Sequence, residues 1–589
     1  RAALRRLAAL EGPFSRALAE RMLAPSPDAP GDSPAATEAL LRLVDASMVL
    51  LETGPARAVA PYRIPRTVAA FAWAEAVRRG EADALADHHA AEVVAFAERE
   101  ATALSGIEHV AAERRLAALV PDVRRAIGRI GTGAGVGLGI RLAAALFRFW
   151  YRRGVPAVAD SWLEALLADP RARCEPPRLV ALAVCAAGVF AHARGDARAA
   201  LRRFEDAERR MADLGDARGV AEMRTLAALA ATRLGDLTGA ADRGRAALEA
   251  LDGEDSPVEV AVVRSVLAEI AWRRGDVDAA EALFAQALVV LRTARWHALA
   301  LGNVLRGLGA IAVQRRRFDD AAEYFAEGLA LFQGLDHQAT VAVWHSELGC
   351  LEFERGRLAA ARARFREALA IHQACGGAAG AAIQMHNLGE VALIEGDGAL
   401  ARLLLSRSLE GAPDGATSPR GIRSLCFLAE AHIQLDQPYR ARRQLDACLA
   451  LAEGQRDPTL RAQAQGALGL LELVSGDPEA ARAALGRSLA AWRAANDDPR
   501  GLRFAELALC LLARTGATDA ARDLEASLAP LRAGAPRIGP LESRLRDEAR
   551  ALLGRDRAVA EPASGYPARV GDALAAAERF LAERAPGSP

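Results

Sequence analysis

Residues 348–368 read LGCLEFERGRLAAARARFREA, and this stretch decides the fold. Ala361, Phe365 and Ala368 are spaced by four and then three residues, which places them on one face of an α-helix. Gly349 stands twelve residues before Ala361 and marks a preceding helix. Gly356 lies between the two segments and permits a sharp turn. The stretch therefore predicts two helices joined by a tight turn.

The same arrangement recurs about every 40 residues along the chain. In nine of ten copies a large apolar residue follows the recurring alanine by four positions, and a mostly small residue stands three positions further on. Such periods are typical of solenoids, in which each hairpin buries its apolar face against its neighbours. We expect an all-α solenoid of about ten 40-residue hairpins. The recurring alanines are Ala159, Ala200, Ala240, Ala280, Ala321, Ala361, Ala401, Ala441, Ala481 and Ala520.

A glycine followed by an aspartate separates the two helices in five copies. Glycine adopts the left-handed conformation that ends a helix, and an aspartate side chain accepts hydrogen bonds from the free N–H groups that open the next one. Each pair therefore predicts a short interhelical turn. The pairs are Gly195-Asp196, Gly235-Asp236, Gly275-Asp276, Gly396-Asp397 and Gly476-Asp477.

The pattern resembles the tetratricopeptide repeat, in which a Leu-Gly pair in the first helix and Ala, an aromatic residue or Leu, and Ala in the second recur at these offsets. The period exceeds that family's usual length of about 34 residues, so we expect longer helices or longer loops. The resemblance implies a right-handed superhelix. Its first helices, called A helices below, would line a concave groove, and the aromatic residue of each second helix would pack against the next hairpin.

Residues 1–65 do not follow the repeat. They predict three helices near 2–10, 14–23 and 35–45, a proline-rich loop at 24–34, and a β-hairpin of 48–51 and 62–64 around a turn at 53–55. This order is typical of a winged-helix module. We expect a helical connector at 66–140, the solenoid at 141–534, and C-terminal helices near 541–553 and 568–584 within 535–589.

The segment LRLVDASMV at residues 41–49, together with Tyr62-Arg63-Ile64, Thr67-Val68 and Phe71-Ala72, is similar to the module that follows the nucleotide-binding domain in STAND-type signal-transduction ATPases. That family includes LuxR-type and AfsR-type bacterial regulators. Ala46 and Arg66 replace its usual lysine and glutamate. The resemblance implies that this chain is the arm of such a regulator and that an upstream nucleotide-binding module precedes Arg1.

Composition excludes several chemistries. The 589 residues include no lysine, so this chain holds no P-loop lysine, no ATP-binding lysine of a protein kinase and no pyridoxal Schiff base. We therefore expect no enzyme, no cofactor and no metal. Residues 1–65 contain eight arginines and seven acids, so we expect no direct nucleic-acid binding. Scattered cysteines and short apolar stretches predict a cytoplasmic protein without a membrane span.

Two features suggest chemistry but have ordinary interpretations. The glycine-rich residues 131–139 lack the G-x-G-x-x-G spacing of a phosphate loop and follow a predicted helix, so we interpret them as an interhelical loop. His88 and His89 with Glu92 could place an imidazole and a carboxylate one helical turn apart, as a zinc site requires. Only two ligands would converge, and we interpret these residues as part of a solvated helix.

The groove implied by the repeat resemblance is the predicted functional surface. Mixed charge, amide groups and one tryptophan suit capture of a peptide or protein segment. The alternative is that these are ordinary solvated side chains on a structural arm. The predicted residues are Ser265, Glu269, Trp272, Arg273, Asn303, Arg306, Gln314, Ser346, Glu354, His386, Glu390, Arg423, Glu430 and Gln434.

The leading hypothesis is a non-catalytic sensory or interaction arm of a bacterial STAND-type regulator. Capture of a peptide, protein or small effector in the groove would change how the arm packs on the nucleotide module. A free-standing scaffold and the tail of a kinase or cyclase are the alternatives. The coding sequence upstream of Arg1 discriminates among the three.

Overall fold

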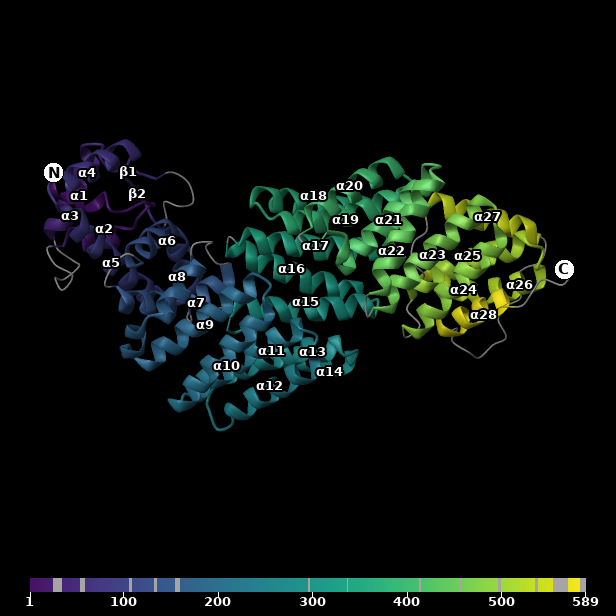
Figure 1. Cartoon of the computed structure of the whole chain (residues 1–589), viewed down its shortest axis with the longest axis horizontal. Helices are drawn as coiled ribbons and strands as arrows, with labels where there is room; N and C mark the ends of the chain where they lie inside the picture. The colour runs from purple at the N-terminus through teal and green to yellow at the C-terminus, as the bar shows by residue number, and fades with distance from the viewer. Residues whose placement is uncertain are drawn as a thin grey trace. The chain divides into compact units, whose positions relative to one another are not determined.

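The structure is a computed structural model. It describes residues 1–24, 34–52, 59–104, 108–131, 135–153, 159–294, 297–335, 337–412, 415–454, 457–495, 499–534, 539–554 and 570–582. These residues form 28 α-helices, a few 3-10 turns and one small two-stranded sheet. They divide into two compact units, Arg1–His337 and Gln338–Pro589. The fold is an all-α, TPR-like solenoid, as the sequence predicts, and successive helices pair along each unit (Figure 1).

The first unit begins with three short helices and a hairpin. The elements are α1 Ala2–Leu7, α2 Arg16–Leu23, α3 Pro34–Asp45, β1 Leu50–Leu51 and β2 Tyr62–Arg63. The strands pair antiparallel with Leu50 opposite Arg63, and Phe14 forms an isolated bridge with Tyr62. The order of helices and strands thus agrees with the expected one. The predicted turn at 53–55 and most of the loop at 24–34 lie outside the described residues.

Longer helices follow, namely α4 Arg66–Arg78, α5 Ala82–Ala103, α6 His109–Ile130 and α7 Val136–Arg153. The interpretation of His89 and Glu92 as solvated is wrong, because both side chains are buried. His89 Nε2 lies 2.9 Å from Asp122 Oδ1, and the same carboxylate accepts hydrogen bonds from the backbone N–H groups of residues 11 and 12. Glu92 pairs with Arg21 at 2.8 Å. These residues therefore fasten the first helices to α5 and α6.

The glycine-rich residues 131–139 are only partly a loop, since Val136–Gly139 form the first turn of α7. Residues 132–134 lie outside the described chain. A Cβ added at Gly137 would lie 2.6 Å from Glu175 Oε1, and one at Gly139 would lie 2.5 Å from Leu166 Cδ1. The side chains of Glu175 and Leu166 therefore approach the start of this helix closely at the two glycines.

The repeats follow as hairpins, each made of an A helix and a second, B helix. The first predicted repeat corresponds to α7 and α8 Ala159–Ala168, and the turn η2 Pro170–Cys174 follows it. The first unit of the fold then contains α9 Pro177–Ala193 with α10 Ala197–Asp213, α11 Ala217–Arg233 with α12 Leu237–Ala250, α13 Pro257–Arg273 with α14 Val277–Leu291, and α15 Ala298–Gln314 with α16 Phe318–Gly334.

The second unit contains five hairpins among its described residues: α17 Gln338–Glu354 with α18 Leu358–Ala374, α19 Ala378–Glu395 with α20 Gly398–Gly411, α21 Pro419–Gln434 with α22 Pro438–Glu453, α23 Pro458–Ser475 with α24 Pro478–Ala494, and α25 Leu502–Arg514 with α26 Thr518–Leu528. Helices α27 Pro540–Leu553 and α28 Val570–Ala582 come last. Most of the hairpin helices have about 17 residues, so long helices account for the long period.

Small residues lie where the two helices of a hairpin touch. Eight of the recurring alanines, from Ala200 to Ala481, have no exposed surface. The side chain of Ala159 lies outside the described residues, and in the last hairpin the buried alanine is Ala521 rather than the predicted Ala520. A Cβ added at Gly349 would lie 2.5 Å from Cε1 of Phe365. Close approach of the helices therefore depends on these small residues.

The aromatic residue packs against the next hairpin, as expected, and also against its own A helix: Phe365 clusters with Leu388 and Val391 of α19. Phe365 contacts Gly349 of its own hairpin, and Phe204 and Phe325 contact Gly188 and Gly309 in the same way. Phe284 instead contacts Gly307 of the next hairpin. The reason is that a glycine in the A helix leaves a hollow, and the aromatic ring of the paired B helix fills it.

The predicted turn chemistry is present in all five Gly-Asp copies. The glycines have φ between 80° and 86°, as Gly275 does with φ 85°. The aspartates accept a hydrogen bond from the backbone N–H three residues later, at 3.1 Å from Ala279 to Asp276 and 2.8–3.0 Å in the other four. Two hairpins place Arg316 and Asp436 in the left-handed conformation instead, with φ 58° and 53°. Both hairpins therefore turn in the same way despite a steric cost.

Candidate interaction site on the A helices

In the first unit, the predicted site residues lie on α13 and α15. Trp272 and Arg306 are half-buried, and Asn303 and Gln314 are exposed. Glu269 pairs with Arg273 one turn along the same helix at 2.7 Å. Ser265 is buried and donates a hydrogen bond to its own helix at the Val262 carbonyl. Within the described residues, no hydrogen bond or ion pair joins the α13 members of the set to the α15 members.

In the second unit, charged residues from several A helices come together. We call Glu354, Glu390, Arg420, Arg423, Glu430, Arg503 and Glu542 the A-helix cluster. Burial raises the pKa of Glu390 to about 7, and the negative charges of Glu430 and Glu354 act in the same direction. Arg503 and Arg423 act against this shift. Charged residues on α17, α21 and α25 therefore all influence the pKa of Glu390 on α19.

Arg503 on α25 is the best-connected member of the cluster. Its guanidinium donates hydrogen bonds to both carboxylate oxygens of Glu430 on α21, at 3.1 and 2.7 Å, and to Glu542 on α27 at 2.5 Å. Glu430 and Glu542 are only 5% and 6% exposed. Burial lowers the pKa of Arg503, but the two carboxylates outweigh burial and hold the pKa above its ordinary value. One cation therefore neutralises two buried acids.

Arg420 and Arg423 have a different environment. Both lie half-buried on α21, and among the described residues neither has a carboxylate within ion-pair distance. Burial lowers the pKa of each arginine. The charge of Arg423 lowers the pKa of Arg420 further, and that of Arg500 does the same for Arg423, where the negative charges of Glu390 and Asp457 act in the opposite direction. Partly desolvated cations without a carboxylate in direct contact are costly in a folded protein. The pair is therefore suited to bind an anionic group.

The remaining predicted residues of this unit surround the cluster. His386 is buried, and its Nδ1 lies 2.7 Å from Ser424 Oγ. Burial and then the charges of Arg423 and Arg420 lower the pKa of His386 to about 3, so the ring is neutral at neutral pH. The Gln434 side chain donates a hydrogen bond to the Leu393 carbonyl at 2.9 Å. Ser346 is half-buried and Glu354 is exposed on α17.

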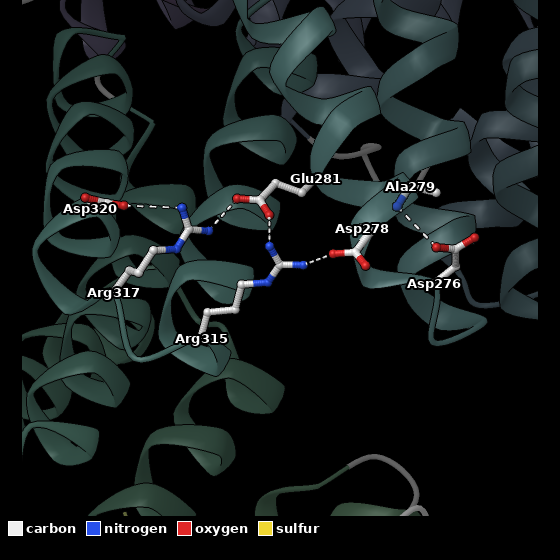
Figure 2. A network of polar contacts seen from close by, with 7 residues as sticks. All are labelled: Asp276, Asp278, Ala279, Glu281, Arg315, Arg317 and Asp320. Atoms are coloured by element: carbon white, nitrogen blue, oxygen red, sulfur yellow. Dashed lines mark hydrogen bonds and ion pairs between the residues drawn. The ribbon is translucent and has the colours of Figure 1, made fainter. Parts of the chain in front are cut away.

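A second group of charges lies at the turns of α13–α16. We call Asp276, Asp278, Glu281, Arg315, Arg317 and Asp320 the turn network (Figure 2). Arg315 contacts Asp278 and Glu281, and Arg317 contacts Glu281 and Asp320. These side chains are mostly exposed, and that of Asp278 is 92% exposed. The network links two consecutive hairpins at their surface.

The sequence did not identify Arg420, Arg503 or Glu542 as site residues. Arg503 lies outside the A-helix positions that the repeat resemblance assigns to the groove, and Glu542 belongs to the tail beyond the repeats. Arg503 joins Glu430 and Glu542 across 73 and 39 residues. A signal was available in the tail, since Pro540 followed by Glu542 is a typical helix start.

The described chain contains no group of three or more His, Cys, Asp or Glu side chains arranged to hold a metal ion. Its helices include none that is long and apolar enough to span a membrane. Cys448 occupies the predicted small position of α22 and is fully buried, with its sulfur 2.8 Å from that of Cys426.

Fold and site together define the class of this chain as a TPR-like α-solenoid with a charged A-helix face. No protein-family model matches the chain, and no curated protein matches it. Among solved structures, it is similar to a Rap protein complexed with competence and sporulation factor, with 13% identity over 61% of this chain and 97% of that chain and a TM-score of 0.45.

Two further structures are similar. One is a STAND protein with a tetratricopeptide repeat sensor from Pyrococcus horikoshii, at 13% identity over 77% of this chain and 63% of that chain, with a TM-score of 0.44. The other is the apo form of the quorum sensor NprR from B. thuringiensis, at 14% identity over 61% and 98%, with a TM-score of 0.42. Because all three TM-scores lie below 0.5, no argument about function rests on them.

Proposed function

We propose that this chain is a non-catalytic protein-interaction arm whose A-helix cluster binds a peptide or protein segment that presents a carboxylate. The observation that carries the proposal is the pair Arg420 and Arg423, which lies half-buried without a carboxylate partner among the described residues. A carboxylate of the partner would accept hydrogen bonds from these guanidinium groups and compensate their desolvation. Glu390 and Glu354 beside them would orient basic or amide groups of the same segment.

The second part of the proposal concerns context. We infer that the arm belongs to a cytoplasmic bacterial regulator of the STAND type, with a winged-helix module at 1–65. The proposal is supported by the LRLVDASMV segment and by the order α1, α2, α3, β1, β2. The coding sequence upstream of Arg1 tests it directly. A nucleotide-binding module there supports the proposal, whereas a kinase or cyclase module, or none, favours the alternatives.

A displayed random-peptide library tests the interaction site. The full chain is immobilised, and selected peptides are synthesised and titrated against variants. We expect selected peptides to contain Asp, Glu or a free C-terminus, and to lose at least tenfold in affinity for Arg423→Glu. Arg317→Glu, with the same charge change in the turn network, should bind within twofold of the unsubstituted chain. Equal binding to both variants, or no selected peptide, would overturn the proposal.

A further inference from the structure

Helix α27 packs mainly against α25 of the preceding hairpin, as a further A helix would. Its first residues also reach helices two and three hairpins earlier. A Cβ added at Gly396, at the end of α19, would lie 2.8 Å from Pro540 Cγ. One added at Gly539 would lie 3.1 Å from the Leu393 carbonyl oxygen and 3.5 Å from Gln434 Nε2. The N-terminal end of α27 therefore touches α19 and α21.

The other end of α27 lies against the last hairpin. Glu548 accepts hydrogen bonds from Arg514 of α25 at 3.1 and 2.7 Å, and Arg550 lies 3.4 Å from Glu525 of α26. A helix of 14 residues is about 21 Å long. The helix thus runs along α25, its first residues reach the C-terminal ends of α19 and α21, and Glu542 joins it to the A-helix cluster.

The contacts of α27 with this face follow a simple pattern. Glu542 in the first turn reaches Arg503, and Leu545 and Ala549 are buried three and seven residues later. These offsets put all three residues on one side of the helix. At the far end, Arg514 is about one third exposed and Glu548 about one half, so their ion pair contributes little. Leu541 and Leu553 also pack against the core of this unit, so the Glu542 carboxylate and the apolar side of the helix hold α27 in place.

Arg503 joins α27 to the A helices through hydrogen bonds to two different carboxylates. It keeps a two-pronged pair with Glu430 of the solenoid and still has a third N–H for the Glu542 carboxylate. When α27 is absent, Glu430 remains paired with Arg503. Removal of α27 therefore leaves no buried carboxylate of the solenoid unpaired at this point.

We propose that α27 is an exchangeable occupant of the A-helix face, and that the partner of this face is an amphipathic helix with a glutamate in its first turn and apolar residues three and seven positions later. This inference rests on the proposed interaction function and specifies its partner. A partner helix takes the place of α27 and places its glutamate on Arg503. Exchange then couples partner binding to release of the C-terminal helix.

A labelled synthetic peptide of residues 539–553 tests the exchange with a defined probe. In the unsubstituted full chain, the resident α27 competes at a high effective concentration, because it is tethered. The peptide should therefore bind weakly, as measured by fluorescence anisotropy. Glu542→Arg in the full chain repels Arg503 and releases α27, so the peptide should bind at least tenfold more tightly. Asp547→Arg is the matched control, since Asp547 is exposed on the same helix, and should change affinity less than twofold.

Two additional variants keep the test decisive. Adding Arg503→Ala to Glu542→Arg should remove the gain in affinity, because the peptide then has no partner for its glutamate. Glu542→Gln, a milder change, should give a smaller gain with unchanged helix content by circular dichroism. Equal peptide affinity for the unsubstituted chain and both Glu542 variants would overturn the inference. The peptide-library test with Arg423→Glu examines the interaction function independently of this experiment. Exchange can therefore fail while the interaction function stands, and the interaction function can fail while exchange occurs.

Discussion

The turn network and the A-helix cluster use the same chemistry in opposite surroundings. In the turn network, Arg317 is 44% exposed and contacts Glu281 and Asp320 at the surface. In the A-helix cluster, Arg503 binds Glu430 and Glu542, which are almost completely buried. Both are arginines between two acids. The difference teaches that burial, rather than the number of ion pairs, decides which charges matter for stability and binding.

The two regions also differ in how completely their arginines are paired with carboxylates. Every arginine of the turn network has a carboxylate partner, whereas Arg420 and Arg423 of the A-helix cluster have none among the described residues. A solvated network can be complete because water screens any residual charge. A buried cluster that is left incomplete costs stability, and such costs are typically retained at functional sites. The comparison therefore favours the A-helix face over the turns as the place of recognition.

The largest effect should follow from Arg503→Ala. The substitution leaves Glu430 and Glu542 buried without a counterion, and we expect a loss of about 3–5 kcal/mol of stability in this region. Hydrogen–deuterium exchange of α21 and α25 measures the loss locally, since repeats respond mainly to their neighbours. Arg514→Ala on the same helix removes a surface pair and should cost less than about 1 kcal/mol. Similar losses for both variants would erase the distinction between the regions.

A pH-dependent effect should follow from Glu390→Gln. Burial raises the pKa of Glu390 to about 7 from an ordinary 4.5. Between these values the folded chain binds more protons at this site than the unfolded chain, so Glu390 lowers stability as pH rises. The variant should match the unsubstituted chain below pH 4.5 and exceed it by about 2–3 kcal/mol at pH 8.

Urea unfolding at several pH values measures this difference. The contribution of His386 is common to both chains and cancels in the comparison. Glu395→Gln, on the same helix and paired with Arg362 near the surface, is the control and should change stability by less than about 1 kcal/mol at any pH. A difference for Glu390→Gln that does not grow with pH would show that this carboxyl group is not desolvated.

In the hairpin next to the turn network, side-chain packing should contribute more to stability than the surface ion pairs do. A Cβ at Gly309 would overlap the ring of Phe325, so Gly309→Ala should cost about 1–3 kcal/mol. Gly334→Ala at the end of α16 meets no atom within 4 Å and should be neutral or stabilising by up to about 1 kcal/mol. Thermal unfolding by circular dichroism compares the two. A neutral Gly309→Ala would contradict the close contact of α15 with α16.

The smallest effect should come from Arg317→Ala. The side chain is exposed, and its loss should cost less than about 1 kcal/mol at low salt and almost nothing at 1 M salt. Thermal unfolding at both salt concentrations provides the measurement. A loss that is large or independent of salt would mean that the turn network is as important as the A-helix cluster.

Sequence was sufficient for the fold because the repeat is local. The alanines, the paired small residues and the Gly-Asp turns act within one hairpin, so their spacing is readable along the chain. Among the nine recurring alanines whose side chains the structure describes, the register failed at Ala520, where the neighbouring Ala521 satisfies nearly the same pattern. His89 was misjudged because its partner Asp122 lies 33 residues away on another helix.

The candidate site was only partly predictable. The repeat resemblance located His386, Glu390, Arg423 and Glu430 on A helices. In the structure, the charge of Arg423 lowers the pKa of His386 and of Glu390, and the charge of Glu430 raises the pKa of Glu390. The resemblance could not supply Arg503 or Glu542, because their contacts depend on how α25 packs on α21 and how α27 packs on α25. Nor could it separate Glu390, which is partly desolvated, from Asn303 and Gln314, which are exposed.

The most direct test of the account is a pair of double-mutant cycles, Arg503 with Glu542 and Arg317 with Glu281, each substituted singly and together to alanine. Local stability from hydrogen exchange gives the coupling energy of each pair. The account predicts more than about 1.5 kcal/mol for Arg503 with Glu542 and less than about 0.5 kcal/mol for Arg317 with Glu281. Equal coupling energies in the two cycles would contradict it.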